Sequence, residues 1–281
     1  VVKYSEIEKT GLSFSQALKY NIDPKTYLRF SYENTFRLPE QHELFGDNNF
    51  ILANYHLNPE KSKNYNLGFT RMGYKYSFEI NTYYRDTKEL IRLKDMNQYQ
   101  ATHLNLDEVK GYGIELEANH EPVENLFLSG HITYNDFRLK ASKDKLLNNK
   151  HYKNARVANM PFYYANFSAS YNLKELFNLS TDLSVFWDYS YVHQYYLDFI
   201  EKQFEPDGFL GLFGSSKINT SRIIPVQHLN NMGIVYVRDL DETRAIAFSA
   251  EVKNIFDADI YNEFKMQSPG RNFRLKITYN F

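Results

Sequence analysis

Large apolar residues occupy every second position near the end of the 281-residue chain. In the stretch 271–281 they are Phe273, Leu275, Ile277, Tyr279 and Phe281. Successive side chains of a β-strand point to opposite faces, so this spacing places all five on one face. The other face then carries polar residues, namely Arg274, Lys276, Thr278 and Asn280. The pattern predicts a strand with one face against an apolar medium and the other face against water.

The same period of two recurs along the chain and predicts eleven strands in all. We expect them at residues 12–20, 26–36, 63–72, 76–92, 109–120, 126–139, 161–171, 181–195, 225–238, 244–254 and 271–281. A strand rises about 3.3 Å per residue, so about ten tilted residues are enough to cross a bilayer. Each predicted strand is close to this length or exceeds it.

The connections between these strands alternate between short turns and long polar segments. The long segments are 37–62, 94–108, 140–160, 196–224 and 254–270. Short turns at one end and long loops at the other are typical of barrels in the bacterial outer membrane. The sequence therefore predicts an all-β fold, an antiparallel transmembrane β-barrel of about eleven strands. The alternative is a soluble β-sandwich, which would have shorter strands and no such asymmetry.

The odd number of strands indicates an incomplete barrel. Single-chain bacterial barrels have even strand numbers and both termini in the periplasm. Eleven is half of the 22 strands found in plugged outer-membrane transporters. We therefore expect residues 1–281 to form a single domain, the C-terminal half of a larger barrel. The alternative is a twelve-stranded barrel that closes on itself, with a further strand in residues 1–10.

Composition supports the membrane interpretation and excludes several kinds of site. Aromatic residues make up 17% of the chain, with 24 Tyr and 22 Phe against one Trp. Tyr suits the headgroup level of a bilayer because its ring is apolar and its hydroxyl is polar. The chain has no cysteine, which excludes disulfides, thiolate metal sites and cysteine nucleophiles. The formal net charge of −1 gives no support for binding nucleic acid.

Two boxes and a C-terminal signature carry a family resemblance. The segment 36–39 reads FRLP, and the segment 54–60 reads NYHLNPE. The pair resembles the Phe-Arg-x-Pro and Asn-Pro-x-Leu-x-Pro-Glu boxes of TonB-dependent outer-membrane receptors, although Tyr55 replaces the first proline of the second box. The segments 252–257 (VKNIFD) and 268–271 (SPGR) are similar to the C-terminal signature of that family. The strand 271–281 resembles the terminal strand that the barrel-assembly machinery recognises, which implies an assembly role for its five apolar residues.

The resemblance implies an active-transport receptor and not an enzyme. Such a receptor binds a scarce nutrient, such as an iron chelate, haem, cobalamin or an oligosaccharide, at its extracellular loops. The implied location is the outer membrane of a Gram-negative bacterium, with the long loops extracellular and the C-terminus periplasmic. We expect the plug and the first half of the barrel to lie outside this chain. The partners implied are membrane lipid, this missing part, a TonB-type energy transducer that acts through the plug, and a surface lipoprotein. The alternative function is a structural or docking barrel in a larger outer-membrane complex.

Five loop residues are candidate ligand contacts. In haem receptors of the family a histidine between the two boxes is an axial ligand, which suggests His42, and His56 lies within the second box. Arg37 of the first box and the pair Tyr195 and Tyr196 complete the set. The alternative for both histidines is an ordinary loop residue. We assign no metal-ligating set, no catalytic residue and no cofactor, and haem or an iron chelate enters only as a transported ligand.

Overall fold

Eleven long β-strands dominate the computed structural model. It describes residues 10–47, 49–97, 99–141, 151–175, 180–206, 208–213, 222–241 and 243–280. The long strands are β1 (Phe14–Asp23), β2 (Thr26–Arg37), β4 (Glu60–Met72), β5 (Tyr76–Asn97), β6 (Gln100–His120), β7 (Leu126–Ala141), β8 (Tyr163–Lys174), β9 (Thr181–Val192), β12 (Gln227–Asp239), β13 (Ala245–Lys253) and β14 (Asn272–Asn280). All eleven coincide with strands that the alternating pattern predicts.

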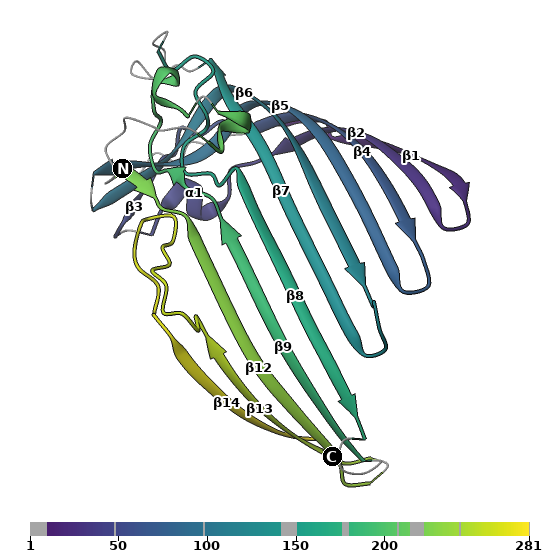
Figure 1. Cartoon of the computed structure of the whole chain (residues 1–281). Coiled ribbons are helices and arrows are strands. Elements are labelled where there is room, and N and C mark those ends of the chain that lie inside the picture. The colour runs from purple at the N-terminus through teal and green to yellow at the C-terminus, as the bar shows by residue number, and fades with distance from the viewer. Residues whose placement is uncertain are drawn as a thin grey trace.

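The long strands pair in sequence order into one antiparallel sheet. The order runs β1-β2-β4-β5-β6-β7-β8-β9-β12-β13-β14, and the short β3 (Ile51–Leu52) pairs with β6 as a twelfth strand. Among the described residues β1 pairs only with β2, and β14 pairs only with β13. The sheet curves along this order without joining its two ends (Figure 1). The prediction of an antiparallel outer-membrane-type barrel fold is confirmed, and the sheet formed by the described residues is open.

The two faces of the sheet differ in chemistry, as a period of two requires. On one face Leu275 of β14 is 82% exposed, and Ile277 lies opposite Phe248 of β13. On the other face polar side chains bond from strand to strand. For example, Asn66 donates to Ser31 (3.0 Å) and Asn81 to Glu115 (3.2 Å). An apolar outer face and a hydrogen-bonded polar inner face are what a lipid-embedded barrel requires.

Long connections gather at one end of the strands and short turns at the other (Figure 1). The long connections contain α1 (Gln41–Phe45), β3, β10 (Tyr195–Tyr196), η1 (Lys202–Phe204), η2 (Phe209–Gly211) and β11 (Ile223–Ile224). None of the helices in the described part of the chain has the length and apolar character to span a bilayer.

The predicted long connection at 94–108 is wrong. β5 and β6 continue through it as one extended hairpin, with Leu90 opposite Leu106 and Asn97 opposite Gln100. The sequence suggested a loop because Asn and Asp are frequent there, and these residues favour turns. In the structure only the tip turns, where the Asn97 side chain accepts a hydrogen bond from the Tyr99 N–H (2.8 Å). This hairpin therefore extends well past β4, whose first residue is Glu60.

Two apolar clusters lie where the long connections fold against the sheet. The first contains Tyr83, Leu106, Val109, Phe137, Leu139 and Val157. The second contains Tyr134, Phe162, Tyr195, Leu197 and Ile224. Both combine strand residues with loop residues, so burial of apolar area holds the loops on the sheet.

Candidate functional site

The loop between β2 and β4 packs against the extended β5–β6 hairpin. Its strand β3 pairs in parallel with β6, with Ile51 opposite Ala101. The Asn54 side chain donates to the carbonyl of His103 on β6 (2.8 Å). Asn105 exchanges hydrogen bonds with the backbone of Asn58 (2.8 and 3.0 Å). The second box is therefore fixed to the hairpin through side chain to backbone contacts.

Arg37, the last residue of β2, connects two carboxylates. Its guanidinium donates two hydrogen bonds to Glu43 (2.9 and 3.0 Å) and two to Glu60 (2.8 and 2.7 Å). The side chains of Glu43 and Glu60 are 9% and 15% exposed. Burial opposes ionisation of Glu43, but hydrogen bonds from Arg37 and from the Glu40 N–H outweigh it and hold the pKa of this carboxyl below its usual range.

His42 and Glu43 on α1 face His103 on β6. Ligand atoms of the three side chains lie within 4.8 Å of one another, and the two imidazole rings meet edge to face at 5.7 Å. Burial lowers the pKa of His103, which lies on the part of the hairpin beyond β4. His42 remains open to solvent, so the cluster has one exposed and two buried members. Sequence reasoning missed His103 because it assigned residues 94–108 to a connection.

Three candidate ligand residues, His56, Tyr195 and Tyr196, are not members of this cluster. His56 is exposed, and its backbone N–H donates to Asn54 (3.1 Å). Tyr195 and Tyr196 form β10, pair with Ile224 and Ile223 of β11, and are each 5% exposed. Of the five predicted contacts, Arg37 bonds to Glu43 and His42 belongs to the cluster with Glu43 and His103, whereas Tyr195 belongs to the second apolar cluster.

Charged residues hold the connection after β9 against β7. Asp136 of β7 pairs with Arg138 (2.7 Å) and with Arg156 (3.0 Å). Glu205, whose side chain is 3% exposed, pairs with Arg138 and accepts a hydrogen bond from the Arg156 N–H (2.7 Å). We call Asp136, Arg138, Arg156 and Glu205 the loop anchor.

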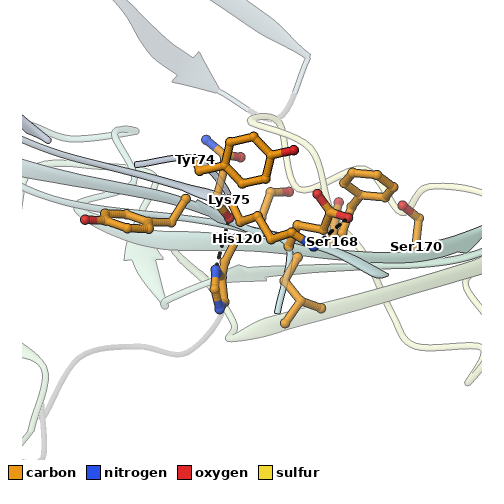
Figure 2. A pocket seen from close by; sticks show the side chains of 11 residues that line it. Tyr74, Lys75, His120, Ser168 and Ser170 are labelled. Atoms are coloured by element: carbon orange, nitrogen blue, oxygen red, sulfur yellow. Dashed lines mark hydrogen bonds and ion pairs between the residues drawn. The ribbon is translucent and has the colours of Figure 1, made fainter. Parts of the chain in front are cut away.

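A shallow cavity of about 310 Å³ lies at the short-turn end of the sheet (Figure 2). Lys75 donates to Glu121 (3.4 Å), and its carbonyl contacts His120 Nδ1 at 3.1 Å. Ser168 and Ser170 of β8 also line the cavity. These contacts join neighbouring turns.

The assembly residues predicted from the terminal pattern lie on β14 at the edge of the sheet. Phe273, Leu275, Ile277 and Tyr279 are 48–82% exposed on the apolar face. Phe281 lies outside the described residues. Their role in assembly stays a prediction.

Comparison with known proteins identifies the family. A family model described as "TonB dependent receptor-like, beta-barrel" matches residues 3–220. Comparison with curated proteins gives no match.

Solved structures of similar fold come from several receptors. The chain is similar to the ferric preacinetobactin receptor BauA of Acinetobacter baumannii (16% identity, TM-score 0.65), covering 95% of this chain and 36% of that one. It is similar to the FrpB iron transporter of Neisseria meningitidis (16% identity, TM-score 0.64), and the match covers 96% of this chain and 40% of that one. It is also similar to the copper transporter OprC (16% identity, TM-score 0.63), and the match covers 94% of this chain and 38% of that one.

At this identity the likeness concerns the fold, and the chain spans about two fifths of the length of these structures. The family model, by contrast, matches more than half of the chain. The chain belongs to the TonB-dependent receptor-like β-barrel family, whose members are outer-membrane transporters of Gram-negative bacteria and not enzymes.

Proposed function

We propose that this chain forms the C-terminal part of the barrel of a receptor that binds a scarce nutrient outside the cell and imports it. Energy for import comes from a TonB-type transducer that acts on a plug outside residues 1–281. Family membership and the open sheet support this proposal. In the proposed orientation the long loops are extracellular, and the short turns and C-terminus are periplasmic.

The observation that carries the proposal is the assembly of separate loops into one surface. The ring of Phe50, between α1 and β3, meets Phe264, between β13 and β14, at 4.9 Å. Asn159, between β7 and β8, donates to the Glu263 carbonyl (3.1 Å) and accepts from Arg92 of β5 (2.7 Å). Loops that interlock across the end of a barrel can present a preformed surface to a ligand, which is the task of a receptor.

The proposed cargo class is an iron chelate, haem, cobalamin or an oligosaccharide. Among the candidate contacts, His42 and His56 are exposed and can meet a ligand in the described conformation. Tyr195 and Tyr196 are buried, so they would contact a ligand only after the loop moves. A surface lipoprotein that covers these loops is a further proposed partner.

Nutrient-limited growth tests the function. The gene for the full receptor is deleted, and growth is measured with each nutrient class as the limiting source, with and without the energy transducer. We expect a growth defect on one class that the wild-type gene rescues only when the transducer is present. Mass spectrometry of ligand that co-purifies with the receptor should identify the same class.

Two variants test whether uptake depends on the surface formed by the long loops. His42→Ala combined with His56→Ala should weaken uptake, whereas His120→Ala at the short-turn end should not. Unchanged uptake of every nutrient, together with loss of an outer-membrane complex, would instead support a docking barrel and contradict the receptor proposal.

A further inference from the structure

We propose that His42, Glu43 and His103 bind one divalent transition-metal ion of the zinc type, which joins α1 to the β5–β6 hairpin. The ion is not the cargo, although His42 is also a proposed cargo contact, and its binding does not depend on which nutrient the receptor imports. It combines two neighbours on a short helix with a residue 60 positions further along the chain, which the sheet brings within reach.

The distances allow coordination after a small closure. The three ligand atoms lie within 4.8 Å of one another. Donors bound to tetrahedral zinc at about 2.0–2.2 Å lie about 3.3 Å apart. Rotation of the exposed His42 side chain toward Glu43 and His103 can shorten the distances between the ligand atoms to this value.

His103 provides an observation independent of the spacing. It is 7% exposed, and its Nδ1 is buried without a hydrogen-bond partner in the part of the chain that the structure describes. Buried polar atoms are almost always bonded, so an unbonded nitrogen on a ring that belongs to this cluster needs an explanation. Its backbone carbonyl accepts the Asn54 amide (2.8 Å), which fixes the position of this residue on the hairpin. A metal ion held by the imidazole would satisfy the ring.

Glu43 retains one acceptor for a metal. Its Oε2 accepts from Arg37 (2.9 Å) and from the Glu40 N–H (2.7 Å), whereas Oε1, among the described residues, accepts only from Arg37 (3.0 Å). Each carboxylate oxygen has two lone pairs, so one on Oε1 remains. Hydrogen bonds from Arg37 would orient the carboxylate as outer partners do in known metal sites.

His42 is oriented by a second carboxylate. Its Nδ1 lies 3.3 Å from Glu40 Oε2, which leaves Nε2 for the metal. A carboxylate on the distal nitrogen of a ligating histidine is a recurrent feature of zinc sites. The side chain is 63% exposed, so a water molecule can complete the coordination.

Local charge and donor type favour a transition metal over calcium or magnesium. The carboxylates of Glu40, Glu43 and Glu60 outnumber the guanidiniums of Arg37 and Arg92. Two imidazoles and one carboxylate suit Zn²⁺ and its neighbours in the transition series, whereas calcium and magnesium prefer oxygen ligands alone.

Zinc titration of the purified full-length receptor in detergent, after removal of metal with a chelator, tests the proposal. We expect one Zn²⁺ per chain by calorimetry. His42→Ala and His103→Gln should each weaken binding at least tenfold, whereas the matched control His56→Ala, from the same loop, should bind as wild type. Because His42 is exposed, its replacement should leave the fold intact even if the His103 variant assembles poorly.

A structural readout accompanies the titration. Zinc should slow hydrogen exchange of the α1 amides, including the Gly46 N–H that bonds to the His42 carbonyl (3.0 Å), in wild type but not in His42→Ala. Absence of a stoichiometric site, or equal zinc affinity in wild type and His42→Ala, would overturn the proposal. Binding of haem, but not zinc, through His42 would overturn it as well.

Discussion

Arg37, a residue of the first family box, has a structural role because it holds the loop between β2 and β4 in place. The guanidinium has five N–H donors, and the two carboxylates Glu43 and Glu60 accept four hydrogen bonds from it. These contacts join the end of β2 to α1 and to the start of β4. Contact between Arg37 and a transported ligand stays a prediction, and the geometry gives the residue a structural task in addition.

Replacement of Arg37 by Gln should loosen the loop that contains α1. Two carboxylates that are 9% and 15% exposed would lose their counter-ion. Breaking a buried pair costs about 3–5 kcal/mol, and the partial exposure of Arg37 places the expected loss near the lower end. Hydrogen exchange of the α1 amides should rise accordingly, and Arg37→Lys should restore part of the protection. The matched control is Arg29→Gln, which removes an exposed pair with Glu79 and should change stability by less than about 1 kcal/mol.

Gly113 of β6 is required because Tyr83 of β5 and the β7 backbone approach it closely. A Cβ at Gly113 would lie 2.3 Å from the Tyr83 ring and 2.8 Å from the Tyr134 carbonyl oxygen. Gly113→Ala should therefore destabilise the barrel by about 1–3 kcal/mol through overpacking. Gly130→Ala on β7 is the control, because among the described residues the added methyl would meet only Phe167, at 3.9 Å. The folded fraction in urea, read from heat-modifiable gel mobility, measures both, and equal stability of the two variants would contradict this account.

At the scale of elements, the loop anchor determines whether the connection after β9 stays on the sheet. Glu205 receives hydrogen bonds from Arg156 N (2.7 Å) and Lys202 (2.8 Å) in addition to its pair with Arg138. Its side chain is 3% exposed, so water can replace few of these contacts. Tyr195 and Leu197 of the same connection pack into the second apolar cluster.

Glu205→Gln should open this connection without unfolding the strands. Removing one charge from a buried ion pair destabilises by about 3 kcal/mol, the lower end of the usual range, because Arg138 keeps its ion pair with Asp136. Each 1.4 kcal/mol is a factor of ten, so proteolysis near η1 and η2 should accelerate on the order of 100-fold. Lys202→Met is the matched control, because that side chain is 49% exposed and its pair should contribute less than about 1 kcal/mol. Equal cleavage rates in both variants would show that apolar packing alone holds the connection.

The elements also show what the sequence could predict and where it failed. Period-two alternation located all eleven long strands, because a sheet with one face toward lipid leaves its pattern in every strand. Alternation failed at residues 94–108, where polar turn-forming residues such as Asn97 and Asn105 belong to an extended hairpin. His103 could not be joined to His42 from sequence, since only the packing of α1 on this hairpin brings them together. Burial of Tyr195 likewise depends on a loop fold that has no local signature.

At the scale of the whole molecule, the main physical requirement comes from β1 and β14, each of which pairs with a single strand among the described residues. About half of the N–H and C=O groups of an edge strand point away from its neighbour, about five pairs for ten residues. Each group left unpaired in hydrocarbon costs several kcal/mol, so the sum exceeds the 5–15 kcal/mol by which proteins are normally stable. We therefore propose that β1 and β14 each pair with a further strand of the full barrel, and not with each other.

Cysteine crosslinking in the full-length receptor, in a background without other cysteines, tests this arrangement. Ser249→Cys with Lys276→Cys is the positive control, because these residues lie opposite each other on β13 and β14. Lys276→Cys is then combined in turn with Ala17→Cys, Lys19→Cys and Asn21→Cys on β1, which sample three registers on one strand face. A disulfide needs Cα atoms about 4.4–6.8 Å apart, so we expect the control to crosslink and the β1–β14 pairs to remain reduced. An efficient crosslink in any β1–β14 pair would show that the two edges meet and that the sheet closes on itself.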